Sequence, residues 1–287
     1  MVALTLVSFL WAFSFPLIKG TLTGLPPALV AFVRLLLSLV VFMPLIRVRG
    51  FRGATAAALV GIGAVQFGLM YVLYIASYQF LPAHTIVLLT TTTPLFVTLF
   101  NDALTRRFHA RFMLSALLAV CAGLVIEYPD QPLRASISGV LLLQGSNLAF
   151  AFGQVAYVRL SRRHVAWSTT RSFAYLYIGA VVVAALFAFR TGIPADVTFD
   201  TRQALTLLYL GIVASGLCFF LWNFGARQVG AGTLAVMNNL KIPLGMIASL
   251  LLLGERTDYL RLLAGVGLMG LALFLDRHAP QRVSRRH

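Results

Sequence analysis

Lys241 is a cationic residue inside an otherwise apolar stretch of the sequence. It stands in Asn239-Leu240-Lys241-Ile242-Pro243-Leu244, about midway along the apolar run 232–254. A charge at the centre of a bilayer costs about 2.5–3.5 kcal/mol even on the lenient insertion scale, and such residues are functional by default. We predict that Lys241 lines a polar cavity and binds a carboxylate or phosphate group. A structural lysine, paired with helix carbonyls or extended to the interface, is the alternative.

Arg34 is a second charged residue within an apolar run, at 26–46. It lies closer to one end of that run, where a long side chain can reach the interface while its stem stays in lipid. We favour a structural role for Arg34, either anchoring the helix end or pairing with carbonyls. Contact with a substrate is the alternative, and Arg34 is therefore kept as a cavity candidate.

Amides and aromatic side chains recur at helical spacing in several of these runs. Residues three, four or seven apart lie on one face of a helix, which places Gln144, Asn147 and Gln154 together. Amides in lipid need partners, so the stripe lines either a wet cavity or a helix–helix contact. The candidates for substrate contact besides Lys241 and Arg34 are Asn238, Asn147, Gln154, Tyr74, Trp11 and Tyr71.

Two prolines lie near the centres of apolar runs, where they are expected to break helices. Pro94 follows four threonines, Thr90 to Thr93, and Pro243 follows Lys241 by two residues. Proline has no backbone N–H, so a carbonyl one turn earlier loses its helical partner. That carbonyl becomes available to a ligand, to water or to another helix.

Groups that would support catalysis are missing from the centres of the runs. The acids Asp102, Glu127, Glu255 and Asp276 stand near their ends, and the five histidines are scattered. The two cysteines, Cys121 and Cys218, show no metal-site spacing. We therefore predict no catalytic residue, no metal and no cofactor, and the protein is not expected to be an enzyme. A proton-coupled drug antiporter would need a buried acid, which disfavours that class.

The composition requires a membrane around the apolar runs. Of the 287 residues, 60% are hydrophobic and only 11% are charged, and the mean hydropathy is +0.89. Soluble domains carry about 25% charged residues. Each run is long enough to cross a hydrocarbon core of roughly 30 Å. The predicted spans are 2–22, 26–46, 54–78, 82–104, 110–129, 135–159, 170–190, 203–224, 232–254 and 260–276.

The basic residues indicate how the spans are oriented. Arginines gather at 47–52, 106–111, 159–171 and 277–286, which all lie on one side if ten spans alternate. Cytoplasmic loops carry such an excess, so both termini are predicted to be cytoplasmic. Short basic loops between apolar runs indicate a lipid bilayer as partner and argue against nucleic acid, despite a net charge of +15. Short loops and basic tails favour a bacterial inner membrane.

The chain divides into two similar halves, 1–130 and 131–278, followed by a basic cytoplasmic tail at 279–287. Each half holds five predicted spans, and the fourth of each carries the central proline. Five is an odd number, so the second half enters the membrane upside down relative to the first. Inverted repeats are typical of transporters, whose binding site lies near the midplane between the repeats.

These features together resemble the EamA family of the drug/metabolite transporter superfamily. The resemblance is carried by Trp11, by Arg34-Leu35-Leu36, by Pro94 and Pro243, and by Leu252-Leu253-Gly254-Glu255 at the end of the ninth span. It implies an all-α integral membrane protein of ten transmembrane helices in two inverted repeats. The first half departs from the family pattern, since Asn101-Asp102-Ala103 stands where Gly-Glu would be expected.

We predict a secondary transporter that moves an amino acid or another organic anion or zwitterion by alternating access. Export is the expected direction. A cationic drug exporter is the alternative substrate class, and a membrane enzyme or a receptor is a weaker alternative class. Monomer and homodimer both stay open.

Overall fold

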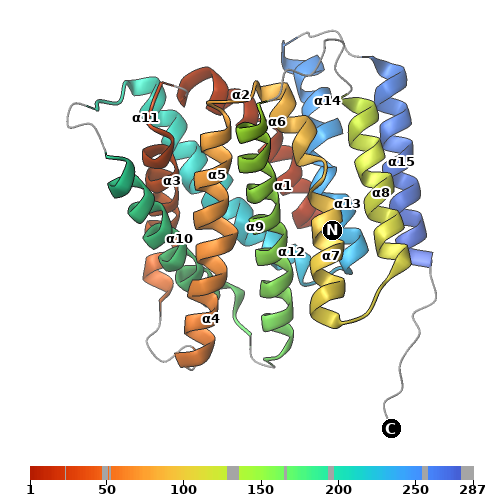
Figure 1. Ribbon diagram of the computed structural model, residues 1–287, viewed down its shortest axis with the longest axis horizontal. Coiled ribbons are helices and arrows are strands. Elements are labelled where there is room, and N and C mark those ends of the chain that lie inside the picture. The colour runs from red at the N-terminus through yellow and green to blue at the C-terminus, as the bar shows by residue number, and fades with distance from the viewer. Residues whose placement is uncertain are drawn as a thin grey trace.

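The computed structural model describes residues 1–22, 24–46, 51, 53–127, 136–164, 167–192, 197–253 and 258–278. Every regular element within these ranges is helical. The helices stand side by side and run roughly parallel, with α8 (Ala110–Ile126) and α15 (Tyr259–His278) at one end of the long axis. At the other end lie α3 (Pro27–Phe42) and α10 (Thr169–Thr191) (Figure 1).

The remaining elements follow in chain order, and several are short pieces that continue one another. In the first half they are α1 (Val2–Ala12), α2 (Ser14–Leu17), η1 (Ile18–Leu22), η2 (Met43–Leu45), α4 (Gly53–Gly63), η3 (Ala64–Leu69), α5 (Met70–Ser77), α6 (Ala83–Thr90) and α7 (Thr93–Thr105). In the second half they are α9 (Ile137–Arg162), α11 (Thr201–Leu208), η4 (Tyr209–Leu217), α12 (Cys218–Ala226), α13 (Ala231–Asn239) and α14 (Lys241–Leu253).

The predicted all-α membrane fold is confirmed. In the described part of the chain, 7 helical segments are long and apolar enough to cross a membrane, and α1 and α8 are shorter apolar helices. The outer faces are apolar as lipid requires: Leu260, Leu263 and Phe274 of α15 are exposed. The number of spans stays a prediction at ten. The basic tail 279–287, the Gly254-Glu255 pair, the boundary at 130–131 and the Lys19 side chain lie outside the described residues.

The helices around Pro94 and Pro243 are interrupted. α6 ends at Thr90 and α7 begins at Thr93, while α13 ends at Asn239 and α14 begins at Lys241. Pro94 cannot donate to the carbonyl of Thr90, one turn earlier. The hydroxyl of Thr93 donates to that carbonyl instead, at 2.8 Å. At this interruption a side chain therefore replaces the missing backbone donor.

Three segments, η1, η3 and η4, have the wider turn of a π-helix. A π turn shifts the hydrogen-bond register, and such turns are frequently found at functional sites. In η4, side chains from other helices bond to the carbonyls. Ser38 donates to Gly211 at 2.8 Å, Trp11 donates to Ala214 at 2.9 Å, and the Tyr177 hydroxyl donates to Ser215. Helices α1, α3 and α10 are thereby tied to η4.

Helices α4 and α10 cross at a contact formed by two glycines. A Cβ atom on Gly63 would overlap the backbone of Leu176, and a Cβ atom on Gly179 would overlap the carbonyl of Val60. Within a bilayer, helices associate chiefly by close packing of small residues, because lipid tails are as apolar as leucine. This crossing holds α10 against the segment that continues through η3 into α5, which lines the central cavity.

Candidate functional site

A cavity of about 90 Å³, which is not fully enclosed, lies between helices of both halves. Lining residues come from elements as far apart in sequence as α1 and α14, so the cavity forms only when the two halves pack together. The residues that line it are Trp11, Ser14, Ile18, Arg34, Met70, Tyr71, Tyr74, Thr90, Thr93, Ser146, Asn147, Phe150, Phe219 and Lys241.

Arg34 is held in this cavity by neutral groups. Its side chain is only 2% exposed. Nη2 donates to the Tyr71 hydroxyl at 2.9 Å and to Ser215 Oγ at 3.2 Å, and Nε donates to Ser215 Oγ at 3.3 Å. The guanidinium also lies 4.4 Å from the centroid of the Tyr71 ring, within cation–π range. Neither Tyr71 nor Ser215 carries a charge, so these contacts orient the guanidinium without neutralising it.

The remaining guanidinium nitrogen of Arg34, Nη1, is buried and has no hydrogen-bond partner within the described structure. The two ion pairs seen among the described residues are His109–Asp102 and Arg261–Asp258, and neither includes Arg34. Burying a cation without a partner carries a large desolvation cost. The arrangement therefore offers a fixed, uncompensated positive charge to whatever enters the cavity.

Lys241 brings a second positive charge to the same cavity. It is the first residue of α14, directly after the interruption at Leu240, and its side chain is partly buried. No Asp or Glu stands among the described residues that line the cavity. The cavity consequently has two cationic side chains and no acidic one, which is an arrangement suited to binding an anion.

The two helix interruptions contact each other through Asn239. The carbonyl of Thr91 lacks its usual helical partner because the N–H of Leu95 bonds to Thr92 instead. Asn239, the last residue of α13, donates its amide to that carbonyl at 2.9 Å and to the carbonyl of Ala119 at 2.9 Å. A single buried side chain thus satisfies the backbone of α6–α7 and of α8 at the point where α13 ends.

We expect Asn239→Leu to destabilise the protein by about 1–3 kcal/mol, because the buried carbonyl of Thr91 would lose its donor, while that of Ala119 keeps its helical partner within α8. Asn239→Asp should be at least as harmful, since a carboxylate cannot donate to a carbonyl. The measurement is thermal unfolding of purified protein in detergent. Leu240→Ala, at the adjacent and partly buried position, is the control. Equal melting temperatures for Asn239→Leu and the wild type would contradict the contact.

Asn147 stabilises the same interruption from the opposite side. Its amide donates to the carbonyl of Leu89 at 3.0 Å and lies 3.3 Å from Thr92 Oγ1 and from Gln144 Oε1. Thr92 also donates to Gln144 Oε1, at 2.9 Å. Asn147 therefore lines the cavity and holds the end of α6 in place, so both interpretations of the polar stripe apply at this residue.

Aromatic rings form the apolar walls of the cavity. Trp11 lies 5.0 Å from Phe219 and 5.0 Å from Trp222, measured between ring centroids, and 6.1 Å from Phe150. The indole N–H of Trp11 is already used by Ala214, so this side chain offers a ring face to a ligand. The Tyr74 hydroxyl is 2.8 Å from the Tyr78 hydroxyl.

Two predicted contacts, Gln154 and Asn238, lie beside the cavity and not in its lining. Gln154 Nε2 is 3.4 Å from Asn238 Oδ1, and Trp222 Nε1 donates to Gln154 Oε1 at 3.1 Å. Asn238 also donates to the carbonyl of Leu234 at 2.8 Å. These three side chains form a buried group, here called the amide cluster.

Several lining residues were not among the predicted contacts. Two of them, Thr90 and Thr93, belong to the threonine run before Pro94. The others are Ser14, Ile18, Met70, Ser146, Phe150 and Phe219. Ser146 stands next to Asn147, and its hydroxyl donates to the carbonyl of Met70 at 3.0 Å. The apolar ones carry no sequence signal, since a phenylalanine facing a cavity has the same spacing as one facing lipid.

Among the described residues, no three His, Cys, Asp or Glu side chains gather where they could hold a metal ion. The polar atoms of the cavity are instead hydroxyls, amides and the two cationic groups. This set can bind and orient an anionic organic molecule through charge and hydrogen bonds.

Known proteins resemble the chain over nearly its whole length. A "probable biotin transporter" of Pseudomonas aeruginosa is 38% identical over 276 residues, which are 96% of each chain. "Biotin transporters" of Salmonella typhimurium and Escherichia coli strain K12 are each 36% identical over 279 residues, covering 96% of this chain and 93% of theirs. A solved crystal structure with 16% identity has a TM-score of 0.73 and covers 96% of each chain, which supports the fold.

A family model matches in two places. The model described as the EamA-like transporter family matches residues 1–128 and again residues 137–275. The two matches together cover most of the chain, as the sequence resemblance implied. The protein is accordingly an integral membrane transporter of small molecules, and the chain belongs to the EamA-like transporter family.

Proposed function

We propose that this transporter carries a small organic monoanion, with biotin as the first candidate, by alternating access. The observation that carries the proposal is the pairing of Arg34 and Lys241 in one cavity that no described acid lines. A carboxylate would supply the partner that Arg34 Nη1 lacks. Arginine and carboxylate form short, charge-assisted hydrogen bonds that are roughly twice as strong as neutral ones.

Biotin has the groups that the rest of the cavity can bind. Its carboxylate matches the cations, its ureido ring has N–H donors and a carbonyl, and its ring system and aliphatic chain are apolar. Asn147, Thr90 and Thr93 supply amide and hydroxyl groups, and Trp11 and Phe219 supply apolar ring faces. The names of the relatives support the same substrate. A free amino acid fits less well, because its ammonium group would have no acidic partner among the lining residues.

The size of the cavity supports a carrier that must open. Ligand pockets usually measure about 300–1,000 Å³, and this cavity is about 90 Å³. The helices around it must therefore separate when substrate binds. The interruptions after Thr90 and after Asn239 are places where two of these helices can bend.

The distribution of arginines along the sequence supports the proposal that both termini lie in the cytoplasm of a bacterium. Export as the direction of transport stays a prediction, and so does the choice between monomer and dimer.

The test is competition for uptake of radiolabelled biotin into proteoliposomes that contain the purified protein. We expect biotin to compete and biotin amide, which lacks the negative charge, to compete at least about tenfold less well, since a charged hydrogen bond contributes about 1.5–3 kcal/mol. Amino acids, phosphorylated metabolites and cationic dyes complete the panel. Competition by the cationic dyes alone would overturn the proposal and favour the drug-exporter alternative. Loading the vesicles with biotin measures export in the same preparation.

Substitution of Lys241 tests the second cation. We expect Lys241→Gln to weaken biotin binding about 10–100-fold, for the loss of one charged hydrogen bond, and Lys241→Arg to keep part of the affinity. Binding is measured as the biotin-dependent rise in melting temperature, because a ligand of the folded state stabilises it by mass action. Unchanged binding and flux in a folded Lys241→Gln protein would assign the lysine a structural role.

A further inference from the structure

A second cavity, here called the arginine vestibule, lies where α7, α9, α12 and α13 meet at the arginine-rich end of the bundle. Its volume is about 300 Å³, larger than that of the central cavity. Its lining combines apolar side chains with three arginines and two neutral polar residues, Asn101 and Thr105. The residues that line it are Asn101, Leu104, Thr105, Val155, Val158, Arg159, Arg162, Arg163, Ala226, Val229, Ala231 and Leu234.

Three arginines give the vestibule a strong positive charge. Arg162 donates to the carbonyl of Val229 at 3.2 Å, which fixes one guanidinium at the rim. Arg159 is partly buried and has no hydrogen bond or ion pair with the described residues. No described Asp or Glu lines the vestibule. A cleft with charges of one sign and low-dielectric walls concentrates oppositely charged solutes.

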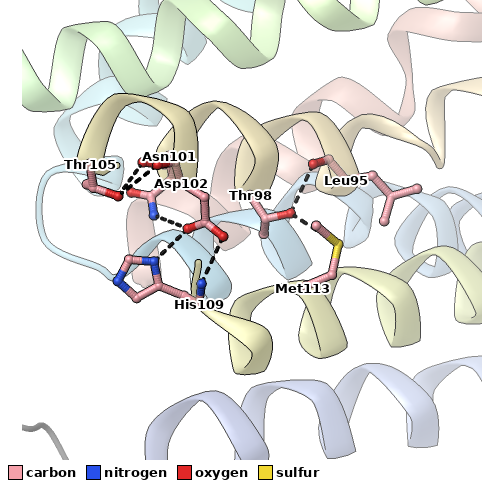
Figure 2. A network of polar contacts seen from close by, with 7 residues as sticks. All are labelled: Leu95, Thr98, Asn101, Asp102, Thr105, His109 and Met113. Carbon is pink, nitrogen blue, oxygen red and sulfur yellow. Dashed lines mark hydrogen bonds and ion pairs between the residues drawn. The ribbon is translucent and has the colours of Figure 1, made fainter. Parts of the chain in front are cut away.

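Asp102, which follows the lining residue Asn101 in the sequence, already has hydrogen-bond partners outside the vestibule lining. One carboxylate oxygen accepts from the backbone N–H of His109 at 2.9 Å, and the other lies 2.6 Å from His109 Nδ1 and accepts from Asn101 at 3.1 Å (Figure 2). The network ties the end of α7 to the start of α8. Among the described residues the ion-pair partner of this carboxylate is His109, and it forms no direct ion pair with the arginines of the vestibule.

The start of α13 already has an acidic partner. Thr233 Oγ1 donates to Asp276 Oδ2 at 2.6 Å, and Asp276 Oδ1 lies where it would meet a Cβ atom on Gly232. Asp276 does not line the vestibule, so the charge of the vestibule comes from its arginines and not from the helix N-terminus.

The amide cluster separates the vestibule from the central cavity. On α9, Phe150 lines the central cavity, Gln154 belongs to the cluster and Val155 lines the vestibule. On α13 and α14, the same order is found for Lys241, Asn238 and Leu234. Gln154, Asn238 and Trp222 are each at most 5% exposed and bond to one another, so they close the direct route between the cavities.

We infer that the arginine vestibule is a docking site for the carboxylate of the transported molecule, on the far side of the amide cluster from Arg34. This inference rests on the proposed function. A substrate released from the central cavity would pass the amide cluster and contact the arginines before it reached water. A substrate that entered through the vestibule would contact the arginines before it reached the amide cluster. The same chemistry would also bind a phosphate group, either free or on a lipid.

The binding test uses a fluorophore at the vestibule rim. The exposed residue Thr105 is replaced by cysteine and labelled with an environment-sensitive dye, in a Cys121→Ser background and an uncharged detergent. Biotin should change the fluorescence in the otherwise wild-type protein and in Arg34→Gln. The double substitution Arg159→Gln and Arg163→Gln should weaken this response about tenfold or more. Arg171→Gln removes one positive charge from α10, outside the vestibule, and should leave the response unchanged; it is compared with each single substitution, Arg159→Gln and Arg163→Gln.

Three outcomes would overturn the inference. The first is the absence of any biotin response, and the second is a biotin response that survives the double substitution. The third is a response to phosphatidylglycerol vesicles but not to biotin or inorganic phosphate, which would make the vestibule a lipid site. Failure of the proposed function is seen separately, as the absence of biotin transport in proteoliposomes of the wild-type protein.

A transport readout separates docking from a structural role. In vesicles with the arginine-rich end facing outward, the double substitution should raise the KM for biotin about tenfold and leave the maximal rate unchanged. It should also remove the dependence of KM on ionic strength, because salt screens such exposed charges. A fall in the maximal rate with unchanged KM and salt dependence would contradict docking.

Discussion

We expect Arg34→Gln to reduce biotin transport at least about a hundredfold, since removing one side of a buried charged pair costs about 3–5 kcal/mol. The folded protein should nevertheless be nearly as stable without ligand, because the substitution removes a buried cation whose partners, Tyr71 and Ser215, are neutral. The measurements are initial uptake in proteoliposomes and melting temperature in detergent, each with and without biotin. Biotin should raise the melting temperature of the wild type by much more than that of the variant.

The conservative variants identify what Arg34 contributes. Arg34→Lys keeps the charge but loses the planar fork that can bond Ser215, Tyr71 and a carboxylate together, so it should recover only part of the activity. Tyr71→Phe removes one acceptor of Arg34 and keeps the ring beneath the guanidinium. It should therefore reduce biotin transport less than Arg34→Gln or Arg34→Lys does. The opposite result would be an Arg34→Gln protein that unfolds more easily but has the wild-type rate of biotin transport per folded molecule. That result would support the structural role that the sequence favours for Arg34.

The second large effect is expected at the α4–α10 crossing. Gly179→Ala should lower the unfolding free energy by about 1–3 kcal/mol or more, the usual cost of overpacking, because the new Cβ would meet the backbone of Val60. Gly179→Leu should prevent folding. Gly61→Ala, on the same helix pair, is the matched control, since nothing lies within 4 Å of its Cβ position. The measurement is thermal unfolding, and similar losses at Gly61 and Gly179 would contradict the close crossing.

The cationic residues could be predicted because charge inside an apolar run is rare and informative. Lys241 and Arg34 both line the central cavity, although the sequence favoured a structural role for Arg34. Its position near one end of a run suggested an interface, and nothing in the sequence indicated that Tyr71 and Ser215 would hold it inside the bundle.

Depth within the bundle was harder to predict than helical face. Gln154 shares a face with Asn147, as its spacing requires, but it lies seven residues further along α9, roughly 10 Å at 1.5 Å per residue. That distance places it in the amide cluster instead of the cavity lining. The π turns of η3 and η4 were also not predicted, because their residues are as apolar as those of the neighbouring α-helices.

The wide turns of η4 also control the rotational phase of the helix that follows them. Each residue of an α-helix advances the chain by about 100°, so a π turn, which holds one residue more than usual, rotates everything after it. Phe219 and Trp222 lie just beyond η4, in α12. If the same residues of η4 wound as an α-helix, both rings would turn away from Trp11, with no change to either ring. The direction in which α12 presents its aromatic face is thus encoded upstream, as a local surplus of one residue.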